Sequence, residues 1–211
     1  MSEINQETRI FSLSGNHLSL DFINTLDDRM DIQPSEVLAS YSDLVSWSQQ
    51  TGIMMDEEAQ VLLKEATQQP AKAEKVRQQA IMLREALFRI FARITDDADP
   101  DEVDVQFFNA ALAGALSKVC VVPEGEGFGW DWNEKGIALD RMLWPVIRAT
   151  ADLMTSKELH AVRICASEDC AWLFLDTSKN HTRRWCDMKT CGNRVKVSRH
   201  YERKKQDVRK G

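Results

Sequence analysis

Long apolar runs are missing from this chain of 211 residues. A helix that crosses a bilayer needs about 20 consecutive apolar residues, and no segment approaches that length. The opening residues, Met1-Ser2-Glu3-Ile4-Asn5-Gln6, also lack the basic start and apolar stretch of a secretory signal. We therefore expect a cytoplasmic protein without a membrane partner.

Internal repeats are absent too. In addition, no group of side chains supplies a nucleophile, a base and an orienting residue together. We therefore expect no enzymatic activity and no catalytic residue. His17 is interpreted as a structural hydrogen-bonding group. Asp21 and Asn24 lie at helical spacing and are candidate ligand-binding residues, with a small metabolite as the substrate if the helical domain were an enzyme. The alternative is that these polar side chains only fix neighbouring loops.

Cysteine is scarce, and four of the five cysteines fall close together as Cys165-x4-Cys170-x15-Cys186-x4-Cys191. Thiols stay reduced in the cytoplasm, so such pairs hold metal more often than they form disulfides. Four thiolate ligands predict one closed, structural Zn²⁺ site, because a catalytic zinc keeps a position open for water. The fifth, Cys120, is interpreted as an inert, small apolar residue.

Charge is distributed unevenly along the chain. The whole chain has a net charge of −6, from 27 basic and 33 acidic residues. Residues 157–211 hold 14 basic and 7 acidic residues, a net of +7, so residues 1–156 hold 13 and 26, a net of −13. This asymmetry predicts two domains, an acidic body over 1–156 and a basic module over 157–211.

The body is predicted to be mainly α-helical. Apolar residues recurring every three or four positions predict helices that open at Pro34, near Asp56, at Pro70, after Pro100 and at Gly136. We place Val103 and Phe107 among the apolar positions of the helix after Pro100 and expect Pro145 to kink the last helix. The segments 119–122 and 128–132 predict a short β-hairpin.

The module is predicted to be a small finger with a β-hairpin, a treble-clef-like metal site and a helix. Gly192 would allow backbone near a thiolate, and Asn193 is placed as the cap of a helix that presents a basic stripe. Candidate nucleic-acid-binding residues are Arg183, Arg184, Arg194, Lys196, Arg199, Arg203, Lys204 and Lys205. Two alternatives stay open. In one, the cations nearest the metal serve only to neutralise the charge of the thiolates; in the other, the later cations form a solvated tail.

These residues resemble a known family. Cys165-x4-Cys170-x-Trp172-Leu173-Phe174-Leu175, Arg183-Arg184-Trp185-Cys186 and Cys191-Gly192-Asn193-Arg194 are similar to the CGNR zinc finger, which is named after the last four. The segment from Gly15 to Thr25 resembles the opening of the ABATE domain, which accompanies that finger in bacterial stress-induced transcription regulators. The resemblance implies a metal-stabilised DNA-binding module joined to a helical domain that senses a signal or mediates association.

The leading hypothesis is therefore a cytoplasmic bacterial transcription regulator that binds DNA. The alternative is a zinc-stabilised module that binds RNA or an acidic protein, without sequence-specific DNA recognition. A homodimer formed through the acidic body is left open.

Overall fold

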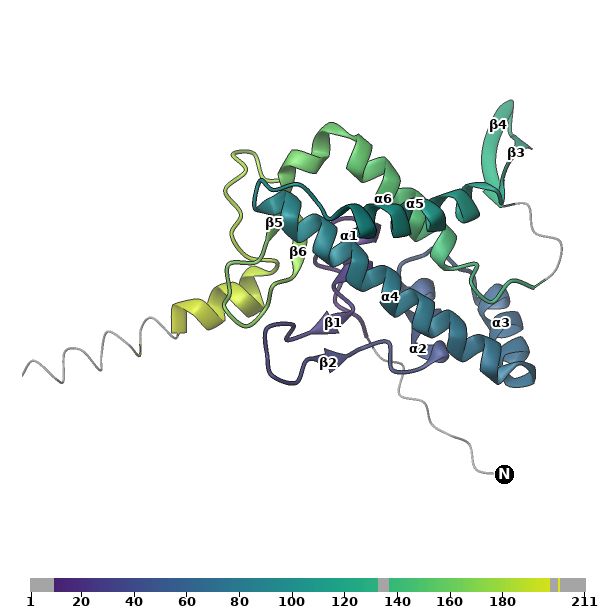
Figure 1. Cartoon of the computed structure of the whole chain (residues 1–211), viewed down its shortest axis with the longest axis horizontal. Coiled ribbons are helices and arrows are strands. Elements are labelled where there is room, and N and C mark those ends of the chain that lie inside the picture. Colours follow the sequence, from purple (N-terminus) through teal and green to yellow (C-terminus); the bar gives the residue numbers. More distant parts are fainter. Residues whose placement is uncertain (1–9, 133–136, 198–200, 202–211) are drawn as a thin grey trace, which may run out of the picture.

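The computed structural model describes residues 10–132, 137–197 and 201. Figure 1 shows a helical body with the C-terminal segment at one end and a hairpin projecting at the other. The α-helices are α1 (Leu18–Ile23), α2 (Tyr41–Gln50), α3 (Asp56–Gln68), α4 (Pro70–Thr95), α5 (Glu102–Leu116) and α6 (Leu143–Thr155). The predicted fold class, mainly α with short hairpins and a zinc-finger-like cysteine cluster, is confirmed.

The described residues also form three antiparallel two-stranded sheets. They pair β1 (Leu26–Asp27) with β2 (Ser35–Glu36), β3 (Val119–Glu124) with β4 (Gly127–Trp132), and β5 (Val162–Ile164) with β6 (Leu173–Leu175). Two short non-α helices, η1 (Lys157–Ala161) and η2 (Met188–Gly192), flank the C-terminal sheet. The predicted hairpin is β3–β4.

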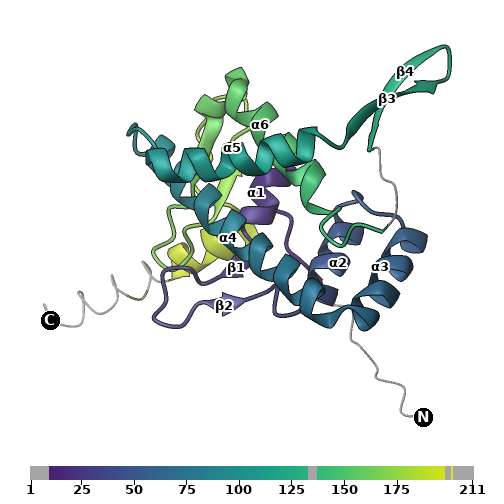
Figure 2. The ribbon, with the colours of Figure 1, turned by 45° about the vertical axis from the view of Figure 1, so that its right-hand side comes forward.

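Helix α4 is the central helix of the body, and Figure 2 shows α2 and α3 beside one end of it. Pro70 occupies its first turn, where the missing N–H of proline costs nothing. The predicted apolar positions from Val76 to Phe91 are buried along one face. Asp101 then occupies the N-cap position of α5, which packs on both α4 and α6.

Two predicted helix starts are wrong. The helix expected from Pro34 begins at Tyr41, because Ser40 and Asp43 form a reciprocal capping box there. Glu36 is instead held in β2, where it pairs with Arg84 of α4. The last helix begins at Leu143, so Pro145 lies in its first turn and no kink is required.

Two apolar positions predicted for α5 are exposed. Val103 is 77% exposed and Phe107 is 40% exposed. The buried positions include Asp104 and Phe108, and Arg89 on α4 donates two hydrogen bonds to the Asp104 carboxylate. Apolar residues of α5 consequently line the surface.

The main core is built around α1, and it includes the C-terminal hairpin. Leu20, Phe22 and Ile23 are fully buried, and the Phe22 ring meets the edge of Trp47 at 5.4 Å between centroids. Leu173 and Leu175 of β6 belong to the same core cluster. The boundary expected between residues 156 and 157 falls between α6 and η1, yet both sides of it contribute to this core.

Candidate metal centre

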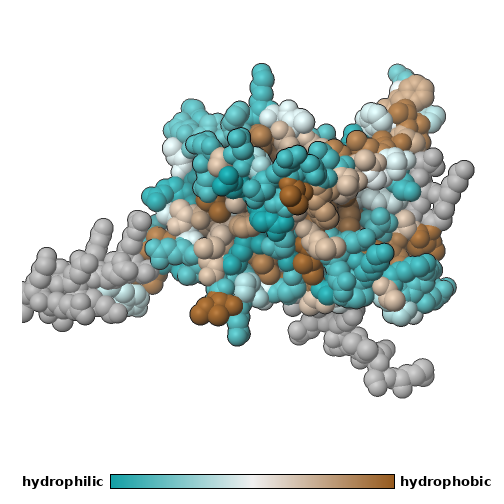
Figure 3. All heavy atoms as spheres, viewed as in Figure 1, coloured by the Kyte–Doolittle hydropathy of each residue, from teal (hydrophilic) through white to brown (hydrophobic). Residues whose placement is uncertain are grey.

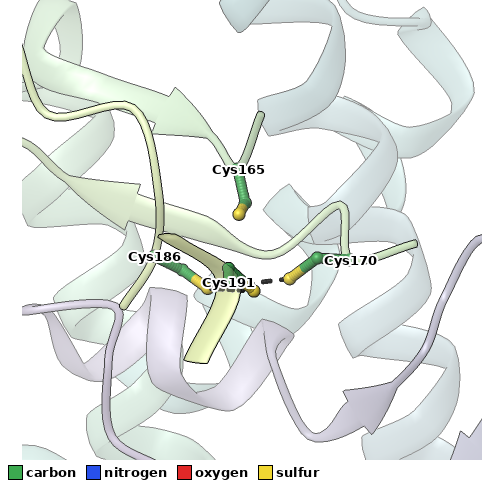
Figure 4. A group of neighbouring side chains, drawn as sticks. All are labelled: Cys165, Cys170, Cys186 and Cys191. Atoms are coloured by element: carbon green, nitrogen blue, oxygen red, sulfur yellow. Dashed lines mark hydrogen bonds between the residues drawn. The ribbon is translucent and has the colours of Figure 1, made fainter. Parts of the chain in front are cut away.

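Four loop and helix segments bring the cysteines to one point. Cys165 follows β5 directly and Cys170 precedes β6, so the two lie at either side of one hairpin turn. Cys186 lies in the loop after β6, and Cys191 lies within η2. Figure 4 shows the four side chains converging from these separate elements.

The sulfur positions fit a tetrahedral zinc ion. All four Sγ atoms lie within 4.8 Å of one another, and all four residues are buried. The Sγ of Cys186 is 3.6 Å from the Sγ atoms of both Cys170 and Cys191. A Zn–S bond of about 2.3 Å places sulfurs about 3.8 Å apart on a tetrahedral edge. A disulfide would require about 2.05 Å, and the five cysteines are free thiols.

The shifted pKa values of the cysteine thiols indicate why this cluster favours a bound cation. The pKa of the Cys165 thiol is lowered, first because Cys170 and then Cys186 donate hydrogen bonds to its sulfur. The pKa values of Cys170 and Cys186 are raised, chiefly by the interaction with the Cys165 sulfur. Without a metal the sulfurs must therefore share protons, and Zn²⁺ would replace them and stabilise the thiolates.

Backbone amides support the sulfurs. The amides of Cys186 and Ser167 donate to the Cys165 sulfur, and the Trp172 amide donates to that of Cys170. Such outer-shell hydrogen bonds orient metal ligands. An added Cβ at Gly192 would lie against the sulfur of the Met188 side chain, and the expected approach of the Gly192 backbone to a thiolate stays a prediction.

The helix after the metal begins earlier than predicted. The Asp187 side chain accepts a hydrogen bond from the Thr190 amide and so caps η2. Residues 193–197 continue as helix. Asn193 is therefore inside the helical segment and is not its cap; its side chain donates to the Lys189 carbonyl at 3.0 Å. Cys191, a metal ligand, lies in the first turns of this helix.

Arg183 has a structural position in the finger. Its Nε donates to the Trp185 carbonyl at 2.9 Å, and its Nη2 donates to the carbonyls of Ser14 and Cys186. Its guanidinium also lies 4.4 Å from the Phe174 ring centroid. These contacts favour the local interpretation of this cation.

The other predicted nucleic-acid-binding residues that the structure describes are exposed. Arg184 lies over the Trp185 ring at 5.5 Å, and Arg194 approaches Asp169 at 3.9 Å. Lys196 is exposed on the helical segment 193–197. The remaining ones, Arg199, Arg203, Lys204 and Lys205, lie outside the described residues.

The loop between the two cysteine pairs depends on a residue that the site prediction omitted. Asp176 is fully buried, and its carboxylate accepts hydrogen bonds from the Ser178 amide and hydroxyl and from the Arg183 amide. Burial acts to raise the pKa of this carboxyl, but the hydrogen bonds outweigh it and the pKa is lowered. The Asp-x-Ser pattern is typical of such turns and is the signal that could have identified it.

Asp21 and Asn24 both bond to backbone. Gly15 N–H donates to Asp21 Oδ1 at 2.8 Å, an approach that requires glycine because an added Cβ would lie 2.9 Å from the Asp21 nitrogen. Asn24 Oδ1 accepts from Leu173 N at 2.9 Å, and its Nδ2 donates to Leu173 O at 2.8 Å. Asn24 also borders a cavity of about 330 Å³. Their role in ligand binding stays a prediction.

His17 begins α1. It is the N-cap residue of this helix, and its Nδ1 accepts from the Ser19 amide at 3.3 Å. Burial lowers the pKa of its imidazole, against the charges of Glu158 and Asp152.

Comparison with protein families matches two regions of the chain. Residues 161–204 match the CGNR zinc finger, and residues 16–157 match ABATE, described as "Putative stress-induced transcription regulator". The chain belongs to the ABATE family. The expected resemblance is therefore confirmed, and in this ABATE protein the four cysteines form the structural zinc site of the CGNR finger. No curated protein matches the chain.

The described helices of the ABATE protein include none that is both long and apolar enough to span a membrane.

Proposed function

We propose that the ABATE protein regulates transcription by binding duplex DNA through its CGNR finger and the basic segment after Cys191. The observation that carries this proposal is the position of Cys191. This metal ligand lies in η2, directly before the helical residues 193–197 that present exposed cations. A zinc ion held there would fix the direction of the helix relative to the body.

Charge supports the same surface. Lys189, Arg194 and Lys196 are exposed around the start of the helix, and Arg184 is exposed beside the metal. DNA phosphates are recognised mainly by such Arg and Lys side chains. The net charges of +7 and −13 for the module and the body would orient the finger toward DNA and the body away from it.

Arg183 is excluded from the proposed contact set. Its guanidinium donates to backbone carbonyls of both the finger and the N-terminal segment. Its charge partly offsets the two negative charges of a zinc tetrathiolate, so its loss would disturb the fold before it disturbed DNA contacts.

The test measures DNA affinity of zinc-loaded protein by fluorescence anisotropy at several salt concentrations. Lys196→Glu and the pair Arg199→Glu with Arg203→Glu are compared with the control Lys75→Glu, an exposed lysine on α4. We expect each lost phosphate contact to reduce the salt slope by about 0.9, and the control to leave it unchanged. Binding that ignores salt, or that survives the Arg199 and Arg203 changes, would refute the proposal.

The same titration separates the alternative function. Structured RNA and an acidic polypeptide serve as competitors for labelled duplex DNA. Tighter binding of either competitor than of duplex DNA would replace the DNA proposal by the corresponding binding-module function. Selection from a randomised DNA pool then measures sequence preference.

We further propose that the protein acts without catalysis. The hydrogen bonds of Asp21 and Asn24 to the Gly15 and Leu173 backbone support a structural use of these side chains. A small-molecule turnover that Asp21→Asn abolished would overturn this part of the proposal.

A further inference from the structure

The hairpin β3–β4 has one wholly apolar face. Directly opposite residues of an antiparallel pair point to the same side of the sheet. The pairs Val119↔Trp132, Val121↔Trp130 and Pro123↔Phe128 therefore share a face, and they alternate with pairs that include Cys120↔Asp131 and Glu124↔Gly127 on the other. An amphipathic hairpin of this kind normally rests its apolar face on a core.

Here that face is open to solvent over most of its length. Figures 1 and 2 show the hairpin extending away from the helical body, and Figure 3 shows apolar atoms gathered on it. Phe128 is 78% exposed, Trp130 is 65% exposed and Val121 is 56% exposed. An isolated two-stranded hairpin is only marginally stable, and a contiguous apolar patch on it indicates a contact surface.

Within the described residues, the hairpin contacts the body at Trp132 near its base and at Trp130 at mid-length. The ring of Trp132 lies 5.8 Å from that of Trp144 on α6, and the Arg148 guanidinium lies 5.0 Å from the Trp130 ring. Trp144 also lines a cavity of about 510 Å³ between α4, α5 and α6, together with Phe107 and Lys118. The apolar face thus continues through Trp132 and Trp144 into an apolar hollow.

We propose that the apolar face of β3–β4 packs against the same face of a second copy of the chain, related by a two-fold axis. With this axis perpendicular to the strands, the tip of each hairpin lies at the base of the other. The base carries Lys118, which precedes β3, whereas the turn between the strands carries the exposed Glu126. A two-fold axis therefore brings opposite charges together at both ends of the apolar strip.

The register follows from the length of the apolar strip. Its midpoint is the Val121↔Trp130 pair, which would lie near the two-fold axis. Phe128 of the second copy would then reach the base, beside Trp144 and the hollow lined by Phe107. The part of α5 that lines this hollow, including Phe107, would be covered by this contact.

The charge arrangement favours a second copy over an unrelated partner, because one hairpin supplies both halves of the complementary pattern.

The first test is the oligomeric state of zinc-loaded full-length protein, measured by analytical ultracentrifugation without DNA over about a hundredfold range of concentration. We expect a dimer whose dissociation constant rises about tenfold or more in Phe128→Ser, which loses a buried aromatic contact. Ile32→Ser, at a side chain 97% exposed on the β1–β2 connection, is the control and should change nothing.

A charge exchange provides the second test. Lys118→Glu and Glu126→Lys should each weaken the dimer, because each places like charges at both ends of the strip. The double variant exchanges the two charges within one chain, so we expect it to recover most of the lost affinity. Unchanged helical circular dichroism shows that the variants fold.

A protein that is monomeric at every concentration would overturn the inference. So would a dimer that is indifferent to Phe128→Ser, or single charge variants whose effects simply add in the double variant. An apolar partner protein or small molecule bound by the monomer would assign the face to that occupant instead. Because no measurement includes DNA, failure here leaves the proposed DNA binding untouched, and loss of DNA binding leaves the dimer untouched.

Discussion

Replacing Asn24 by alanine removes the amide that joins α1 to β6. Asn24 is 4% exposed and Leu173 is fully buried, and the side chain makes one bond to the Leu173 N–H and one to its carbonyl. A buried polar group left without a partner costs about 1–3 kcal/mol. Alanine would leave two such groups, so we expect Asn24→Ala to lower the free energy of unfolding by about 2–6 kcal/mol.

The measurement is urea unfolding of zinc-loaded protein, followed by tryptophan fluorescence and by circular dichroism. Asn24→Asp retains an acceptor for the Leu173 N–H but places a buried carboxylate against the Leu173 carbonyl, so at neutral pH we expect a loss at least as large as that of alanine. Gln49→Ala is the control, because its hydrogen bond to Asp56 is exposed and should be worth less than about 0.5 kcal/mol.

A loss below about 1 kcal/mol in Asn24→Ala would refute the structural account, because the Leu173 backbone would then have another partner. Asn24 would in that case be free to act on a ligand in the adjacent cavity. Coincident fluorescence and circular dichroism transitions are needed for this comparison, since they show that the finger and the body unfold together.

Two further outcomes follow from the metal site and from Asp21. Purified protein should contain one zinc per chain. Removal of the zinc by a chelator, or its loss in Cys186→Ser, should melt the helix after Cys191 and lower the midpoint of thermal unfolding. An unchanged midpoint in metal-free protein would contradict the structural role of the zinc. Burial raises the pKa of the Asp21 carboxyl to about 6, against the Gly15 hydrogen bond. Native protein therefore keeps a proton that the unfolded chain releases, so this group reduces stability as the pH rises from about 4 to about 6. Asp21→Asn should remove up to about 3 kcal/mol of that pH dependence in urea unfolding, whereas parallel profiles for the two proteins would contradict it.

The metal site could be predicted from the sequence because the type and the spacing of its ligand residues identify it. Two cysteine pairs of equal spacing allow few other uses, and the structure places all four sulfurs within 4.8 Å. The long helix from Pro70 was equally readable, since one face repeats apolar residues over its whole length. Here local pattern and tertiary packing agree.

Long-range contacts explain what could not be predicted. Glu36 is in β2 because Arg84, which is 2% exposed on α4, donates two hydrogen bonds to its carboxylate. The periodicity of α5 favours no single face, and the Arg89–Asp104 pair links its buried side to α4. Partners 48 and 15 residues apart leave no mark on a local pattern.

The shared core has a thermodynamic consequence for the two regions of the chain. Trp172, between Cys170 and β6, donates its indole N–H to the Leu26 carbonyl, and Leu175 N–H donates to the Gly15 carbonyl. Strand β6, which follows the metal ligand Cys170, is therefore also part of the core of the helical body. Because zinc binds the folded finger, it stabilises the body through this strand. By reciprocity, whatever strengthens the packing of α1 on β6 must raise the affinity of the finger for its metal by the same factor.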